Sequence, residues 1–130
     1  MNAGRTAARL LTYSAAGWGI ESFWRRKPPR SPVWGGQDVP FLPIYGLGAL
    51  LALAMQERMK NVSLPLRFAA YAAGLTGFEW LSCKAGRAIY GYVGWEYQDG
   101  SCIDVPHALA WGGLGLVLEK ADPAIFGQRP

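Results

Sequence analysis

Charged side chains are scarce in this 130-residue chain, and cysteine and histidine are nearly absent. Charged residues make up 17% of the sequence, against about 25% in an average soluble domain. The two cysteines, Cys83 and Cys102, are too few for a disulfide framework and too far apart for a C-x-x-C motif. They either pair on an oxidising face or remain free thiols. The shortage of charge favours contact with lipid, and the length predicts a single domain over residues 1–130.

Recognised catalytic and metal-binding motifs are also missing. There is no G-x-S-x-G elbow, no G-x-x-x-x-G-K-[ST] phosphate loop and no metal-ligand spacing of acidic residues and histidine. The one histidine, His107, follows Asp104 by three residues. This pair could serve as a general base, but Asp104 fits better as the N-cap of a helix. We expect no catalytic residue, no metal and no cofactor, so an enzyme is the less favoured class.

The net charge of +4 comes from cations that cluster between apolar segments. Basic residues in such loops suit contact with anionic lipid headgroups. No nucleic-acid-binding motif accompanies them, so we expect no nucleic-acid partner. The two clusters are Arg25, Arg26, Lys27 and Arg30, and then Arg58, Lys60 and Arg67.

Four apolar segments stand out, at residues 8–24, 41–56, 66–83 and 105–118. A membrane-spanning helix takes about 20 residues, so the shorter segments fit buried core helices as readily. Their many glycines and alanines favour membrane helices, because small residues let neighbouring backbones approach closely there, whereas glycine weakens a helix in water by about 1 kcal/mol. The sequence therefore predicts an all-α integral membrane bundle of about four transmembrane helices, with loops at 25–40, 57–65 and 84–104.

A weak duplication runs through the chain. Residues 13–21 read YSAAGWGIE and residues 71–79 read YAAGLTGFE, sharing Tyr, Ala, Gly and Glu at equivalent places. Each half continues with W-x-x-Q-D, then Val-Pro, then a helix containing G-x-G. Repeats over 10–60 and 66–120 would form two pseudo-symmetric helical hairpins, related by an axis along the membrane normal.

The duplication gives two glutamates equivalent positions, Glu21 and Glu79. A carboxylate inside a membrane helix costs about 2.5–3.5 kcal/mol on insertion scales, so it usually faces a cavity or a partner. We predict a polar or ligand-binding site in which aromatic side chains gate the two carboxylates. The alternative is two structural carboxylates near the interface, each satisfied by a cation or a backbone N–H. The site residues are Glu21, Glu79, Tyr45, Trp95, Tyr97 and Arg25, the last within i,i+4 reach of Glu21.

These motifs also resemble a known family. The order Y-x-x-x-G-W-x-x-E from Tyr13, PIYG from Pro43, Glu79-Trp80 and GWEYQDG from Gly94 is similar to that of the putative ABC-transporter type IV family, also called the CmpB and transmembrane protein 229 family. The resemblance covers residues 10 to 120 and implies a multi-helix integral membrane protein. The chain departs from the family pattern before PIYG and near His107, where the usual loop Arg and a Tyr-x-Pro-x-Trp are not in place.

The predicted function is therefore that of a small multi-pass membrane protein, a permease-like subunit in the cytoplasmic (plasma) membrane. The alternative is a non-enzymatic structural or assembly subunit of a membrane complex. The expected partners are the lipid bilayer and either further copies of the chain or a partner membrane subunit. Any ATPase would be a separate polypeptide, because the sequence has no phosphate loop.

Overall fold

The computed structural model describes residues 2–25, 43–90 and 102–127, and every regular element in these ranges is a helix. The four helices are α1 (Ala3–Arg25), α2 (Pro43–Arg58), α3 (Leu64–Tyr90) and α4 (Val105–Phe126). The prediction of an all-α chain with four helices is confirmed. In the same ranges, no helix combines the length and the apolar character that crossing a membrane requires.

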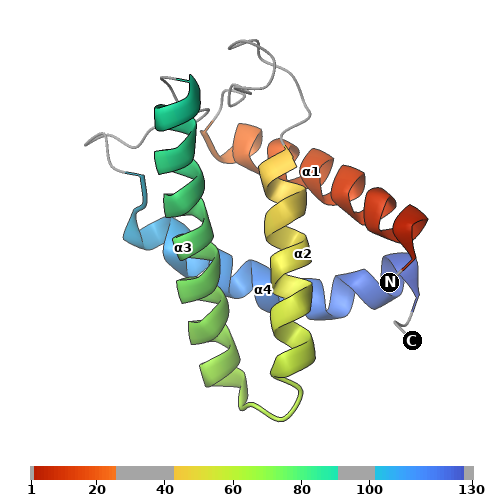
Figure 1. Ribbon diagram of the computed structural model, residues 1–130. Helices are drawn as coiled ribbons and strands as arrows, with labels where there is room; N and C mark the ends of the chain where they lie inside the picture. The colour runs from red at the N-terminus through yellow and green to blue at the C-terminus, as the bar shows by residue number, and fades with distance from the viewer. Residues whose placement is uncertain (1, 26–42, 91–101, 128–130) are drawn as a thin grey trace.

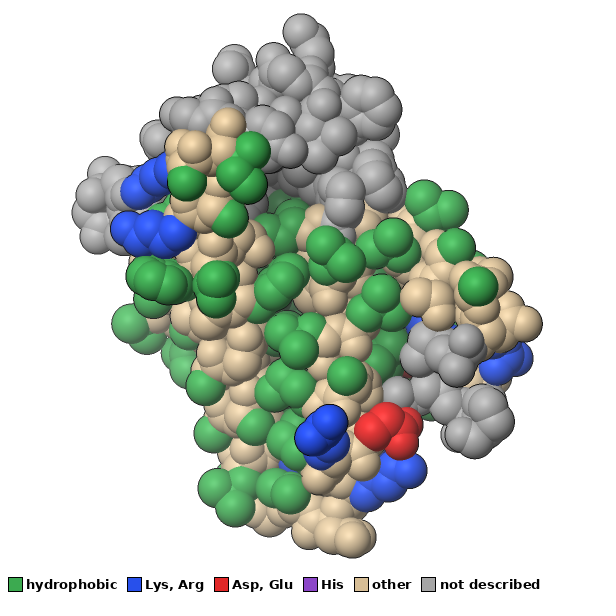
Figure 2. Space-filling view, viewed as in Figure 1, with side chains coloured by type: hydrophobic (Ala, Val, Ile, Leu, Met, Phe, Trp, Pro, Cys, Tyr) green, Lys and Arg blue, Asp and Glu red, His purple; other side chains and the backbone are tan. Residues whose placement is uncertain are grey.

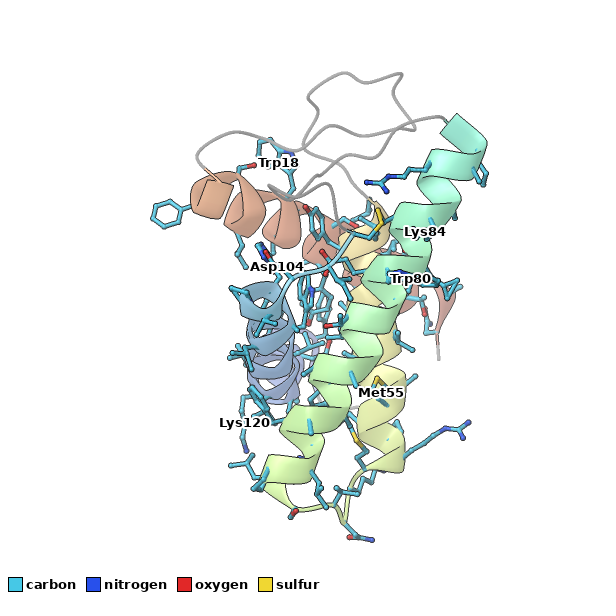
Figure 3. The ribbon with its side chains drawn as sticks, turned by 90° about the vertical axis from the view of Figure 1, so that its left-hand side faces the viewer. Trp18, Met55, Trp80, Lys84, Asp104 and Lys120 are labelled. Carbon is cyan, nitrogen blue, oxygen red and sulfur yellow. A yellow bond between two sulfur atoms is a disulfide. The ribbon has the colours of Figure 1, made fainter. Side chains whose placement is uncertain are left out.

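The helices are arranged around an antiparallel hairpin formed by α2 and α3 (Figure 1). Helix α1 packs mainly on α2, and helix α4 packs mainly on α3. Both outer helices run across the hairpin, and the two ends of the chain lie close together (Figure 1). Seen after a 90° turn about the vertical axis, α4 again lies beside α3 (Figure 3). The buried core centres on Ala52, Tyr71 and Leu75.

Three of the predicted helices are longer in the structure than their apolar segments. Helix α1 begins at Ala3, α3 continues to Tyr90, and α4 continues to Phe126. The prediction that residues 84–90 belong to a loop is therefore wrong. Lys84 and Arg87 end the apolar run, but lysine and arginine are good helix formers and do not end a helix. Lys84 extends over the ring of Trp80, one turn earlier, with Nζ 5.8 Å from the ring centroid (Figure 3).

Helix α4 begins and ends with capping residues. The Asp104 carboxylate accepts a 2.8 Å hydrogen bond from the backbone N–H of His107 and lies 2.6 Å from His107 Nδ1. This geometry confirms the prediction that Asp104 caps the helix. At the other end Gly127 adopts a positive φ of 78°, and its N–H donates to the carbonyl of Pro123.

Glycines allow the paired helices to touch through their backbones. Gly46 of α2 donates its N–H to Ser14 Oγ of α1 at 3.1 Å. A Cβ at Gly46 would collide with the backbone carbonyl of Leu10. A Cβ at Gly115 of α4 would collide with the Cβ and ring atoms of Tyr71. Gly46 and Gly115 are therefore helix contacts, whereas a Cβ at Gly77 or Gly113 would meet nothing within 4 Å.

The two cysteines form a disulfide that ties α3 to the residues before α4. Cys83 and Cys102 have Cα atoms 5.7 Å apart and are separated by 19 positions in the sequence. Both side chains are buried, and neither cysteine is free. The alternative of two free thiols is therefore wrong. Because α4 packs on α3, Cys102, just before α4, lies next to Cys83 of α3. The spacing of the two cysteines in the sequence does not predict this pairing.

We predict that Gly46→Ala destabilises the fold by about 1–3 kcal/mol, as overpacking of a rigid contact does. The colliding atom is a backbone oxygen, which cannot move aside by changing rotamer. Gly113→Ala is the matched control, because a Cβ at that helical glycine meets nothing within 4 Å. The control should be neutral or stabilising by up to about 1 kcal/mol. Thermal unfolding followed by circular dichroism measures both, and equal effects would contradict the described α1–α2 contact.

We also predict that reducing the Cys83–Cys102 bond lowers the unfolding free energy by about 3 kcal/mol, the amount expected from chain entropy for a loop of this length. The Cys83→Ser/Cys102→Ser double variant should show the same loss and no further response to reductant. Melting curves with and without dithiothreitol provide the measurement. Alkylation of two thiols in the non-reduced protein, seen by intact mass, would refute the pairing.

Candidate functional site

A cavity of about 300 Å³ lies between the four helices. This volume is at the lower end of the range found for ligand pockets. All four helices contribute to its wall, so its shape depends on the whole fold and not on one loop. We call it the Glu79 cavity. Its wall consists of Tyr13, Ala16, Gly17, Ile20, Ile44, Tyr45, Gly48, Ala49, Ala52, Leu75, Phe78, Glu79, Trp111, Leu114, Gly115, Val117, Leu118, Ala121 and Ile125.

The wall is apolar apart from one carboxylate and a few polar aromatic groups. Among the described residues that line the cavity, Glu79 is the only charged one. Its side chain is 7% exposed, and its Oε2 accepts a 2.6 Å hydrogen bond from the indole Nε1 of Trp111. Since an indole N–H can only donate, this bond orients the carboxylate toward α4. The rings of Tyr13, Tyr45 and Phe78 also line the cavity.

The position of Glu79 follows from the helical repeat of α3. Tyr71, Leu75, Glu79 and Cys83 follow one another at steps of four, and all four are buried. Residues four apart lie on one face of a helix, so this stripe faces the interior along most of α3. An acidic residue in the middle of an otherwise apolar buried stripe is the sequence signal for the site.

Tyr45 reaches the cavity because α1 has a glycine opposite it. A Cβ at Gly17 would collide with the Cβ and ring atoms of Tyr45. Any larger residue at position 17 would therefore push α1 away from α2 or turn the tyrosine out of the cavity. The tyrosine of the PIYG motif is thus positioned by a glycine of the first apolar segment, and this dependence is invisible in the motif itself.

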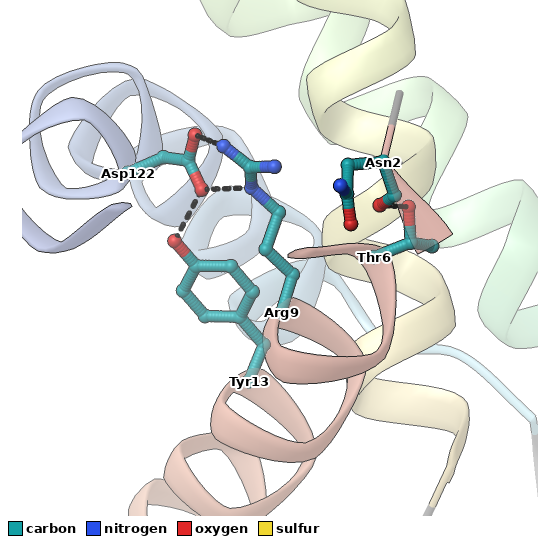
Figure 4. Close-up of polar contacts among 5 residues, drawn as sticks. All are labelled: Asn2, Thr6, Arg9, Tyr13 and Asp122. Carbon is teal, nitrogen blue, oxygen red and sulfur yellow. Dashed lines mark hydrogen bonds and ion pairs between the residues drawn. The ribbon is translucent and has the colours of Figure 1, made fainter. Parts of the chain in front are cut away.

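A buried cluster of polar residues, the Arg9 cluster, joins α1 to α4 beside the cavity (Figure 4). Arg9 Nε and Nη2 donate to the two carboxylate oxygens of Asp122 at 2.8 and 3.0 Å. The Tyr13 hydroxyl donates to Asp122 Oδ1 at 2.7 Å. Arg9 is 1% exposed and Asp122 0%. The guanidinium also lies over the Phe126 ring, 5.1 Å from its centroid, so both charges are paired and enclosed.

A second cluster, the Arg67 cluster, repeats this chemistry between α3 and α4. Arg67 Nε donates to Glu119 Oε1 at 3.1 Å, and the Tyr71 hydroxyl donates to the same oxygen at 2.7 Å. The Arg67 Nη1 also donates to the carbonyl of Val62 at 2.6 Å. In the sequence, Arg67 belongs to a group of basic residues suited to lipid headgroups, but in the structure Arg67 lies in α3 and has a carboxylate partner.

Neither cluster was predicted from the sequence. Both donors show the same spacing, Arg9-x-x-x-Tyr13 and Arg67-x-x-x-Tyr71, and both tyrosines open the duplicated segments. This shared spacing was the feature of the sequence that could have pointed to the two clusters. The acceptors Asp122 and Glu119 both come from the last turns of α4, beyond the predicted end of the fourth helix. Because that end was set too early, the acceptors went unrecognised.

The structure brings together two of the six predicted site residues, Glu79 and Tyr45, in one cavity. Glu21 and Arg25 lie on the last turns of α1, and their side chains are outside the described part of the structure. Trp95 and Tyr97 fall in residues 91–101, which are also outside it. The pairing of Glu21 with Glu79, and the gating role of the aromatic residues, therefore stay predictions.

Metal chemistry has no evident place in the described residues. Over 2–25, 43–90 and 102–127, no group of three or more His, Cys, Asp or Glu side chains could hold an ion. Asp104 and His107 serve the start of α4 and do not line the Glu79 cavity. What the cavity offers is a binding surface with one acidic group, four aromatic rings and aliphatic walls.

Comparison with known proteins gives one match. The profile of a family described as "Putative ABC-transporter type IV" matches residues 9–125, nearly the whole chain. The family resemblance found in the sequence motifs is thereby confirmed. No curated protein and no solved structure matches the chain.

We predict that Asp122→Asn destabilises the fold by about 3–5 kcal/mol, because it leaves the buried charge of Arg9 without compensation. The Arg9→Met/Asp122→Leu double variant should recover much of that loss, since it removes both charges. Glu57→Gln, which breaks the exposed Glu57–Lys60 pair, is the control and should cost at most about 1 kcal/mol. Chemical denaturation curves give the three values. An Asp122→Asn effect no larger than the control would contradict the described burial.

Proposed function

The chain belongs to the family described as putative ABC-transporter type IV, and we propose that it is a membrane-embedded, transport-related subunit whose solute site is the Glu79 cavity. The observation that carries this proposal is a cavity bounded by all four helices with a buried carboxylate in its wall. Protein interiors are normally close-packed, with few voids larger than a water molecule. An open cavity of about 300 Å³ between the helices is far larger than such a void, and its volume fits a small-molecule binding site.

The distribution of charged and apolar side chains supports membrane embedding. Arg9, Glu79 and Asp122 are buried, whereas many large apolar side chains face outward. Phe23, for example, is 87% exposed. Figure 2 shows hydrophobic side chains spread over the face of α2 and α3, with charged ones mostly toward its edges. This inversion of the usual pattern for water-soluble domains fits an outer surface covered by lipid. The other outward residues include Leu11, Leu47, Leu66, Leu81, Ile89, Val105, Val117 and Ile125.

The paired clusters explain how such a chain tolerates charge within lipid. Ionisable residues in membrane segments face the bundle interior and pair with one another. The Arg9 cluster and the Arg67 cluster satisfy their charges in this way, each with a tyrosine hydroxyl on the carboxylate. Glu79 accepts the hydrogen bond from Trp111 and also lines the cavity, where it would contact an occupant. We assign the clusters to structure and Glu79 to binding.

If transport is driven by ATP, the ATPase lies outside these 130 residues. The sequence has no phosphate loop, so this subunit would supply the membrane part, and a partner ATPase or further copies of the chain would complete the assembly. We place it in the cytoplasmic (plasma) membrane.

Cysteine labelling in proteoliposomes tests both parts of the proposal, the placement in the membrane and the solute site in the Glu79 cavity. The two natural cysteines are joined in the disulfide, so an introduced cysteine is the only free thiol. Ala49→Cys faces the Glu79 cavity, and Leu47→Cys, on the same helix, faces outward. A small water-soluble methanethiosulfonate reagent needs a thiolate in contact with water. We expect fast labelling at position 49 and little at position 47.

Two other outcomes are informative, and each would contradict one of these two parts. Fast labelling at position 47 would show that the outer face is in water, and the membrane placement would fail. Little labelling at position 49 would show a cavity closed to solutes, and the binding site would fail. Circular dichroism of each variant confirms that the helices are retained.

A further inference from the structure

The Glu79 cavity has a mouth formed only by aliphatic residues, among those the structure describes. A residue that lines a cavity and is also exposed marks its opening. Four described residues meet both conditions, two on α1 and two on α4, so the mouth lies between these helices. They are Ala16, Ile20, Val117 and Ile125. A strongly hydrated solute would lose its water at such an opening without compensation, whereas a ligand with an apolar body would not.

The inner wall of the cavity, unlike its aliphatic mouth, carries an acidic group and aromatic rings. Glu79 contributes a buried carboxylate, and Tyr13, Tyr45, Phe78 and Trp111 contribute aromatic rings. The faces of aromatic rings attract cations, most strongly where water is excluded. No lysine or arginine is among the described lining residues. The cavity wall therefore favours positive charge and disfavours negative charge.

The donor set also excludes a bare metal ion as the preferred ligand. Ca²⁺ takes six to eight oxygen ligands, and Mg²⁺ demands octahedral geometry. The described wall offers one carboxylate and two phenolic hydroxyls, of which the Tyr13 hydroxyl is engaged with Asp122. A quaternary ammonium group needs no such coordination, because its charge is spread over carbon-bound hydrogens that pack against rings and a carboxylate.

We propose that the ligand of the Glu79 cavity is a small organic cation with an apolar body, such as an aromatic or alkyl ammonium compound. The apolar body passes the aliphatic mouth, and the ammonium group lies among the aromatic rings facing Glu79. This inference rests on the proposed function, namely that the cavity is the solute site, and it adds the chemical class of the solute.

Three matched ligands distinguish the contribution of the positive charge to binding from that of the apolar ring. Benzyltrimethylammonium has both features, neopentylbenzene replaces its charged nitrogen by carbon, and tetramethylammonium keeps the charge without the ring. Binding is measured by equilibrium dialysis against the protein in nanodiscs of zwitterionic lipid, with empty nanodiscs subtracted. Wild-type protein should bind benzyltrimethylammonium at least about tenfold more tightly than either of the other two, a difference of about 1.4 kcal/mol.

Two sets of variants assign that preference to the cavity. Glu79→Gln should remove the preference for the cation over neopentylbenzene, and Glu79→Asp, which keeps the charge, should retain it. Glu57→Gln removes an exposed carboxylate outside the cavity and should change nothing. Gly48→Val narrows the cavity and should weaken both ring-bearing ligands, whereas Gly113→Val adds the same side chain where a Cβ meets nothing within 4 Å.

The results have separate meanings. If wild-type protein binds the cation and its neutral isostere equally, or binds neither while Ala49→Cys is labelled, the ligand class is wrong and the solute site stands. If Ala49→Cys is not labelled, the solute site itself has failed. If Glu79→Gln loses its helical signal, the wild-type preference among the three ligands still tests the ligand class, and the Gly48→Val and Gly113→Val pair still tests whether binding takes place in the cavity.

Discussion

The buried ion pair of Arg9 with Asp122 is the interaction on which the rest of the structure depends. It joins the first helix to the last across 113 positions of sequence, with two hydrogen bonds and a third from Tyr13. Removing two charges from solvent is costly unless their geometry is good and their remaining hydrogen-bonding capacity is used. Because this pair fixes α4 against α1, it also fixes the two sides of the cavity mouth, which lie on these helices.

Two arginine–tyrosine pairs with equal spacing converge on α4. The Arg67 cluster attaches α3 to Glu119, one turn before the Asp122 that receives Arg9 and Tyr13. This likeness is what a duplicated hairpin would produce, although both acceptors lie on α4 and Arg9 and Asp122 fall just outside the predicted repeats 10–60 and 66–120. Helix α4 is thus the shared element of the fold, and Trp111 on it also orients the Glu79 carboxylate. The two carboxylates of the clusters lie in the last turns of α4, and the hydrogen-bond partner of Glu79 lies nearer its start.

Much of the fold could be predicted from local signals in the sequence. The four helices, the cap at Asp104 and the family all follow from apolar runs, turn chemistry and motif order. The helix ends could not, because charged residues such as Lys84 end a hydropathy signal without ending a helix. The disulfide and the Arg9 cluster depend on tertiary contacts between distant segments, and no local pattern specifies them. For the site, the burial of Glu79 was predictable from its place in an apolar stripe, whereas its hydrogen bond to Trp111 was not.

The central claim is that Glu79 and Trp111 form one wall of a solute-binding cavity, and the Trp111 indole N–H tests it most directly. In ¹⁵N–¹H spectra of the nanodisc-embedded protein, a Trp111→Phe variant assigns this signal among the six tryptophans. Given the 2.6 Å bond to the carboxylate, the signal should lie downfield, return toward the free-indole position in Glu79→Gln, and move when benzyltrimethylammonium is added. A Trp111 signal at the position of a solvent-exposed indole, indifferent to both the substitution and the cation, would contradict the account.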